Sequence, residues 1–195
     1  MEILEKGKYA SMEELYFQLW IDELEEAGLI DTEEYQPFTA VLADKKSFKF
    51  RKVLKTKTKI EEFNLMQSLK YTPVGEIQFS NHFKDLLGCN IQDVYDSAWT
   101  KKKPLFILTD GIWILDVKGS HDPFGDGRNF VFNQKILLEN KNIYSQKVEI
   151  SNKKGSFFDK TFTPKRYLYT DKSFGRRKLK YKAVSLKEFI DSLKK

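Results

Sequence analysis

The 195-residue chain contains one cysteine, two histidines and no apolar run near the length that crosses a bilayer. The single cysteine, Cys89, cannot form an internal disulfide or a cysteine-based zinc site, so we expect it to pack as a small apolar residue. His82 and His121 are too few for a histidine-rich metal centre. The N-terminus also lacks the basic and apolar order of a signal peptide, so we expect a cytoplasmic protein that has no membrane partner.

Aromatic and charged residues are abundant. The chain has 16 Phe, 9 Tyr and 3 Trp, and 32% of its residues are charged, which is typical of a globular protein and not of a disordered one. The length suits one domain with a substantial core, so we expect residues 1–195 to form a single domain.

The charge is strongly segregated along the chain. Residues 1–40 hold eleven acids against two lysines, a balance of −9, whereas residues 152–195 hold fourteen Lys or Arg against four acids, a balance of +10. A second basic run extends from Lys45 to Lys59. Cationic surfaces of this kind favour a polyanionic partner, for which DNA is the natural candidate. The other interpretation is an ordinary solvated surface rich in lysine.

Hydrophobic periodicity predicts an α/β protein. Ser11 and Glu14 have capping-box spacing, apolar residues then recur at helical intervals, and Gly28 supplies a stop, which predicts a helix over 12–27. Asp110-Gly111 fits a tight turn between two apolar strands. The other expected elements are a strand over 38–42, one arm of a hairpin over 48–59, a short helix over 61–69, an extended segment over 71–79, a helix near 83–87, hairpin strands over 105–108 and 112–117, a helix over 130–140 whose Phe132, Ile136 and Leu137 face the sheet, and a strand over 142–150.

The stretch from Ile112 to Gly119, with the sequence IWILDVKG, is the most informative. In a strand Asp116 and Lys118 share one face, while Trp113, Leu115 and Val117 share the other. A buried charge must be paired or bound to a metal. The pair is therefore either a plain ion pair at a strand end or a cation-binding carboxylate beside a lysine that orients water.

Together with Ser11-Met12-Glu13-Glu14, the helix exit Glu26-Ala27-Gly28-Leu29-Ile30 and the strand start Tyr35-Gln36-Pro37-Phe38, this motif resembles the PD-(D/E)XK nuclease superfamily, and in particular its small phage resolvase-like endonucleases. The resemblance covers about Ser11 to Lys147. It implies a restriction-endonuclease-like core over about 11–150, in which a mixed β-sheet is flanked by helices in the order helix, meander, helix, strand.

The resemblance also implies a site. Its catalytic residues would be Glu14, Glu76, Asp116 and Lys118, and Mg²⁺, or Mn²⁺ in its place, would be held by Glu14, Glu76, Asp116 and the carbonyl of Val117. The family has an aspartate next to the proline of the second strand, where this chain has Val74. Two alternatives remain open: Glu14 could serve only as a helix cap, with Glu13 replacing it, and Glu76 could be an exposed strand residue. A strand register at Pro104-Leu105-Phe106 would leave the second acid missing.

Two further segments are candidates for DNA contact. Gln134 and Lys135 lie on the helix that follows the active strand in the family, although a solvent-facing turn explains them as well. Residues 155–195 fall outside the resemblance, and we expect them to add a basic β-hairpin with strands over 162–169 and 179–184, a turn over 171–175 and a capped helix from Ser185 to about Leu193. The DNA-binding residues expected in this extension are Arg176, Arg177, Lys178 and Lys180, with Leu179 and Tyr181 docked on the body.

The sequence thus predicts a metal-dependent DNA endonuclease, with branched phage DNA in a bacterial host as a candidate substrate. The alternative is a non-catalytic DNA-binding or scaffold protein that keeps the nuclease fold. The resemblance also allows a homodimer, because two symmetric cuts need two sites.

Overall fold

The computed structural model describes residues 9–92, 104–119, 126–169 and 176–194. The central sheet consists of β1 (Ile30–Tyr35), β6 (Gly75–Phe79), β9 (Trp113–Gly119) and β10 (Ser145–Ile150). These strands lie in the order β1-β6-β9-β10. β1 and β9 each run antiparallel to β6, whereas β10 runs parallel to β9. The sheet is therefore mixed.

Two long helices flank this sheet, namely α1 (Met12–Glu26) and α3 (Asp126–Lys141). Helix α1 contacts β9, β1 and β10, while α3 contacts β10 and the short strand β2 (Ala40–Ala43). The predicted α/β class, with a mixed sheet between helices, is confirmed, and the elements follow the expected order of helix, meander, helix and strand. None of the described helices is both long and apolar enough to span a membrane.

Helix α1 begins and ends where local chemistry predicts. The Ser11 hydroxyl accepts a hydrogen bond from the Glu14 amide (3.2 Å), which satisfies one of the free donors of the first turn. Gly28, just beyond the end, has φ +67°, a conformation that side chains with a Cβ rarely adopt. The predicted boundaries of 12–27 are correct to within one residue.

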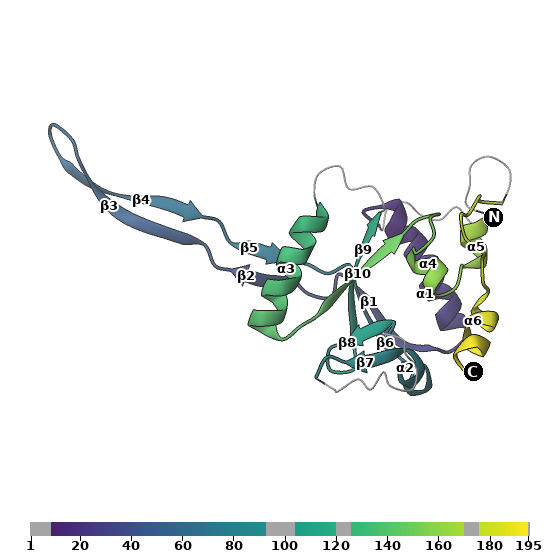
Figure 1. The fold of residues 1–195 in the computed structure, drawn as a ribbon. Helices are drawn as coiled ribbons and strands as arrows, with labels where there is room; N and C mark the ends of the chain where they lie inside the picture. Colours follow the sequence, from purple (N-terminus) through teal and green to yellow (C-terminus); the bar gives the residue numbers. More distant parts are fainter. Residues whose placement is uncertain (1–8, 93–103, 120–125, 170–175, 195) are drawn as a thin grey trace.

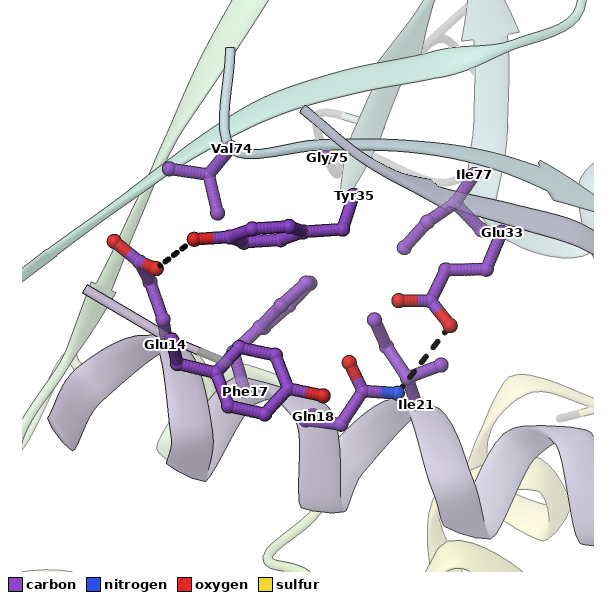
Figure 2. Close-up of a pocket in the computed structure, with 10 residues that line it drawn as sticks. Glu14, Phe17, Gln18, Ile21, Glu33, Tyr35, Val74, Gly75 and Ile77 are labelled. Atoms are coloured by element: carbon purple, nitrogen blue, oxygen red, sulfur yellow. Dashed lines mark hydrogen bonds between the residues drawn. The ribbon is translucent and has the colours of Figure 1, made fainter. Parts of the chain in front are cut away.

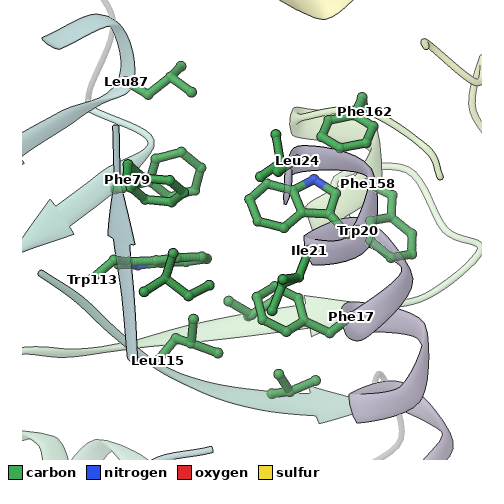
Figure 3. Close-up of a cluster of buried hydrophobic side chains, with 14 of the residues drawn as sticks. Phe17, Trp20, Ile21, Leu24, Phe79, Leu87, Trp113, Leu115, Phe158 and Phe162 are labelled. Atoms are coloured by element: carbon green, nitrogen blue, oxygen red, sulfur yellow. The ribbon is translucent and has the colours of Figure 1, made fainter. Parts of the chain in front are cut away.

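The main core lies between α1 and the sheet. Alternate residues of β9, Trp113, Leu115 and Val117, point into it, and Trp20 of α1 packs against Trp113 with ring centroids 6.1 Å apart (Figure 3). Phe106 approaches Trp113 more closely, at 4.5 Å. The opposite side of β9 carries Ile114, Asp116 and Lys118, which places the charged pair away from the aromatic core.

A long two-stranded ribbon leaves the body between β1 and β6. Its near part pairs β2 with β5 (Leu69–Tyr71), and its far part pairs β3 (Lys46–Val53) with β4 (Thr58–Met66), as Figure 1 shows. We call residues 45–66 the arm. The predicted hairpin strand over 48–59 is partly correct. The helix expected over 61–69 is wrong, because residues 61–66 belong to β4, which pairs with β3, and Leu69 pairs with β2. The strand expected over 38–42 is present as β2, but the sheet itself begins earlier, at Ile30.

The turn at Asp110-Gly111 is confirmed, but the hairpin around it is short. Both residues have positive φ, and Thr109 and Ile112 exchange two backbone hydrogen bonds of 2.8 and 3.0 Å. Beyond this bridge the chain diverges from β9. The preceding strand β8 (Phe106–Leu108) pairs in parallel with β7 (Gly88–Asn90), which follows the helix α2 (Asn81–Leu87).

The predicted basic β-hairpin of the C-terminal extension is wrong. The described residues after β10 form three helices, α4 (Phe157–Lys160), α5 (Lys165–Leu168) and α6 (Leu186–Leu193), joined by irregular segments. Pro164, which has no amide hydrogen, begins α5 inside the expected first strand. The turn expected over 171–175 lies outside the described residues. The capped helix is confirmed as α6, since Ser185 and Glu188 form a capping box.

Candidate functional site

The exposed end of β9 carries the predicted pair. The ladder between β6 and β9 covers only Trp113–Leu115, so Asp116 to Gly119 extend past β6 and pair with β10 alone. The Lys118 Nζ lies 3.2 Å from the Asp116 Oδ2, and the two side chains are 34% and 7% exposed. A buried carboxylate and a half-buried ammonium thus share one face at a strand end, as the alternation of side chains predicts.

Further polar groups surround Asp116. Lys147 of β10 is its register partner and also pairs with Glu149, with 3.6 Å between Nζ and Oε2. The hydroxyl of buried Tyr71 hydrogen-bonds the Ser145 hydroxyl at 2.7 Å, and burial together with the Asp116 charge raises the pKa of Tyr71. The Asp116 carboxylate therefore lies among two lysines and the phenol of Tyr71.

Glu76 lies on the same face of the sheet as Asp116, but not at its side. It is the register partner of Ile114, two residues before Asp116, which makes the two acids diagonal neighbours. Its other partner is Glu34 of β1. Burial, followed by the charge of Glu34, raises the pKa of Glu76. The direct acidic neighbour of Glu76 is thus Glu34, which the sequence analysis did not select, and Asp116 is only its diagonal neighbour.

Glu14 lies on the other side of the sheet, in the pocket between α1 and β1 that Figure 2 shows. Its Oε2 accepts hydrogen bonds from the Tyr35 hydroxyl (2.9 Å) and from the Ala10 amide (3.1 Å). Burial and the hydrogen bond to Glu14 raise the pKa of Tyr35. Glu13, one residue earlier, reaches the end of β9 instead: its Oε1 lies 3.0 Å from the place where a Cβ on Gly119 would stand.

The strand position beside Asp116 is apolar. The Val74 amide donates to the Leu115 carbonyl at 3.0 Å, just before the point where β6 and β9 separate. The family's second acid would stand here, and Val74 packs instead against the hydrophobic core. Within the described ranges, no three Asp, Glu, His or Cys side chains are grouped so that they could hold a metal ion. The structure thus unites Asp116 with Lys118 and leaves Glu14 apart.

The predicted DNA contacts divide into two kinds. Lys135, Arg176, Lys178 and Lys180 are exposed to solvent. Gln134 is held by the fold, since its Nε2 donates to the Ser145 carbonyl at 2.6 Å and ties α3 to β10.

Arg177 is also held by the fold. Its guanidinium lies over the rings of Tyr16 and Tyr167, at 4.7 and 4.4 Å from their centroids, and donates to the Tyr16 hydroxyl at 2.9 Å. Sequence reasoning predicted Arg177 as a DNA contact, and the structure gives it a packing role instead. Leu179 and Tyr181 dock on the core as predicted, although without a partner strand.

Helix α3 faces the sheet differently from the prediction. Leu137 is buried and Ile136 half-buried, but Phe132 points outward and Phe130 takes its place in a small cluster with Tyr71. This cluster packs α3 on the same side of the sheet as Asp116, because the Tyr71 hydroxyl meets Ser145 there.

Comparison with known proteins adds no relative, because no protein-family model, curated protein or solved structure matches the chain.

Proposed function

We propose that this protein is a Mg²⁺-dependent DNA endonuclease with a restriction-endonuclease-like core of the PD-(D/E)XK kind. The order α1, β1, β6, β9, α3, β10 supports this proposal, since the resemblance implies a helix, a meander, a helix and a strand. The acid-x-lysine motif stands on β9, the last strand of the meander.

The observation that carries the proposal is the Asp116–Lys118 pair. An isolated ion pair in a sheet interior gains little, because removing both charges from water offsets most of their attraction. This pair lies where β9 extends beyond β6, and a third of the Lys118 side chain is exposed there. A phosphodiester brings negative charge to such an ammonium and oxygen atoms to a cation beside such a carboxylate.

The residues at this end of β9 supply some, but not all, of the oxygen ligands expected for Mg²⁺. Mg²⁺ is typically held by one or two carboxylates, with waters and substrate phosphate completing its octahedron. Asp116 and the Val117 carbonyl supply oxygens, and Glu76 lies on the same face. Glu14 lies on the other side of the sheet, where its Oε2 is bonded to Tyr35 and Ala10. When bound, the metal would lower the pKa of a water and offset charge on the phosphate.

Lys118 would act on the same phosphate. Its ammonium has three N–H donors, and the ion pair with Asp116 occupies one of them. The others are available to orient the attacking water or to donate to a phosphate oxygen as negative charge develops there. Exposed cations, among them Lys135, Lys178 and Lys180, would hold the DNA backbone.

One observation favours a second function, a non-catalytic DNA-binding or scaffold protein. Val74 occupies the strand position beside Asp116, and Glu14 is bonded to Tyr35 on the far side of the sheet. A chain that had kept the fold and lost its second acid would show this arrangement.

A cleavage assay distinguishes the two functions. Supercoiled, linear and four-way-junction DNA would be incubated with Mg²⁺ and the wild-type protein, Asp116→Asn or Lys118→Ala. The endonuclease proposal predicts that each substitution lowers the rate by about 100-fold or more. Asp191→Asn and Lys187→Ala serve as matched controls, since both residues are exposed on α6.

Calorimetric titration with Mg²⁺ and Mn²⁺ completes the test. A divalent-ion binding heat that disappears in Asp116→Asn would support the site. Cleavage that survives in both variants would remove Asp116 and Lys118 from the chemistry. DNA binding by the wild type, with neither cleavage nor a binding heat, would establish the second function.

A further inference from the structure

Within the described residues, the two strands of the arm contact mainly each other. Its strands form a regular antiparallel ladder from Ser47↔Asn64 to Val53↔Thr58, and it extends away from the sheet and helices in Figure 1. Every residue of β3 is exposed, and in β4 only Glu61 is partly covered. A two-stranded hairpin on its own is only marginally stable in water. The exposed faces of the arm are therefore typical of a surface that binds a partner.

The arm is strongly cationic. Residues 45–66 carry eight Lys or Arg and two Glu, a net charge of +6 that equals the net charge of the whole chain. Lys52 and Lys59 are direct cross-strand partners, which is destabilising for like charges. Lys52 meets Glu61 at 3.2 Å, and Glu62 lies opposite Lys49. Two acids cannot balance eight cations, so the partner that complements this surface is an anion.

Aromatic rings accompany the cations. Phe48 and Phe63 are cross-strand partners with centroids 5.7 Å apart, and Phe50 lies 6.0 Å from Phe48 on the same face. They remain 46%, 54% and 37% exposed, in that order. Strand alternation places Lys52 and Lys59 on the face of the rings, and Lys49 and Arg51 on the opposite face. Cations therefore lie on both faces of a ribbon whose rings are on one face, an arrangement that suits phosphates and the apolar parts of a nucleic acid at once.

We propose that the arm is a DNA-binding element that lies along a groove of duplex DNA. A strand of eight residues is about 26 Å long, and a two-stranded ribbon fits a major groove about 12 Å wide. Phe48 and Phe63 contact sugars or base edges. Lys59 on the same face, and the long side chains of Lys49 and Arg51 on the opposite face, reach the backbone phosphates that form the walls of the groove. The proposal rests on the proposed function for the identity of the polyanion and adds a contact region separate from the cleavage site.

The distribution of side chains favours DNA over two other partners. A membrane-inserting hairpin concentrates apolar residues at its tip. The tip of the arm exposes Val53 and Leu54, but four lysines accompany them, namely Lys52, Lys55, Lys57 and Lys59. The phenylalanines lie instead in the half of the ladder nearer the body. A second copy of the chain would have to cover the rings and the eight cations together, whereas a duplex offers phosphates to the cations and sugars or base edges to the rings.

Fluorescence anisotropy with a 20-base-pair duplex in EDTA tests the proposal without cleavage. We expect the triple variant Lys49→Gln, Arg51→Gln, Lys59→Gln to bind at least about tenfold more weakly at 0.1 M salt and to reduce the salt slope by about 2–3, since each phosphate contact contributes about 0.9. The matched control neutralises three exposed lysines elsewhere, Lys160, Lys187 and Lys194. The paired change Phe48→Ser with Phe63→Ser should weaken binding with little change in slope, and Tyr169→Ser, also exposed, should not.

The outcomes separate the arm from the catalytic proposal. Equal loss in the arm and control triple variants would overturn the arm proposal. So would a wild-type dimer that becomes a monomer in the phenylalanine variant, because the arm would then join two copies, or arm-dependent binding to anionic vesicles with none to duplex. Arm-dependent DNA binding by a wild type that cleaves no DNA would remove the endonuclease proposal and leave the arm assigned.

Discussion

Aromatic side chains gather in two regions of this molecule, the core under α1 and the arm. The rings are buried in the core and exposed in the arm. In the core, Trp20, Trp113 and Phe106 are fully buried and lie 4.5–6.2 Å apart between centroids. In the arm, Phe48 and Phe63 are as close to each other, at 5.7 Å, yet about half of each is exposed.

The difference comes from the neighbours of the rings. The core rings have apolar neighbours from α1, β6 and β9, so their burial removes no charge from water. The arm rings stand between lysines on a ribbon only two strands thick, and burying them within the chain would also bury those cations. Ring content alone therefore does not indicate a core; the charges at adjacent positions decide whether a ring can fold inward.

The largest effect that tests this comparison is the loss of a core ring. Trp113→Ala should lower the free energy of unfolding by about 3–5 kcal/mol, because it removes a fully buried side chain and leaves a cavity. Phe48→Ala in the arm should change it by about 0.5 kcal/mol or less. Urea unfolding followed by circular dichroism measures both. Comparable losses in the two variants would mean that the arm is part of the folded core.

A middle-sized effect concerns cations. Arg177→Ala should lower the free energy of unfolding by about 1–2 kcal/mol, since its guanidinium lies over two rings of the body, Tyr16 and Tyr167. The same change at the exposed Lys178 should leave stability unaltered. Thermal unfolding of the two variants makes the comparison. If Arg177→Ala is as stable as the wild type and binds DNA more weakly, then Arg177 belongs with the arm cations as a DNA contact.

The sequence predicted those elements whose signals are local. Helix α1 has its cap, its apolar period and its terminal glycine within a short stretch, and Asp110-Gly111 marks its own turn. The face shared by Asp116 and Lys118 follows from strand alternation alone. In each case neighbouring residues determine the conformation.

Other predictions failed because partners distant in sequence decide them. Residues 58–66 form a strand because β3 pairs with them, and β8 leaves the expected hairpin because β7 competes for it. The alternation over 178–182 is satisfied by docking on the core, with no second strand required. For the site, one residue along a helix turns a side chain by about 100°, so the choice between Glu13 and Glu14 depends on how α1 is rotated against the sheet.

The smallest effect compares like charges in the two regions. Lys52 and Lys59 face each other in solvent, whereas on the sheet the exposed Glu34 faces the half-buried Glu76. Burial and the charge of Glu34 raise the pKa of Glu76. As pH rises, the unfolded chain loses the Glu76 proton first, so this group favours the folded state less above the ordinary carboxyl pKa of 4.5. Glu76→Gln, measured in EDTA, should therefore be more stable than the wild type at pH 7, by about 0.2–1 kcal/mol.

That advantage should shrink as pH falls through 4.5 and vanish below it, because Glu76 is then protonated in both states. Lys59→Gln, the matched change in the arm, should show no pH dependence over the same range. Thermal unfolding between pH 3.5 and 7.5 measures both curves. An advantage of Glu76→Gln that persists at the lowest pH would mean that side-chain shape, and not the charge opposite Glu34, distinguishes the two residues. The repulsion between Glu34 and Glu76 on the sheet would then cost no more stability than the repulsion between Lys52 and Lys59 in the arm.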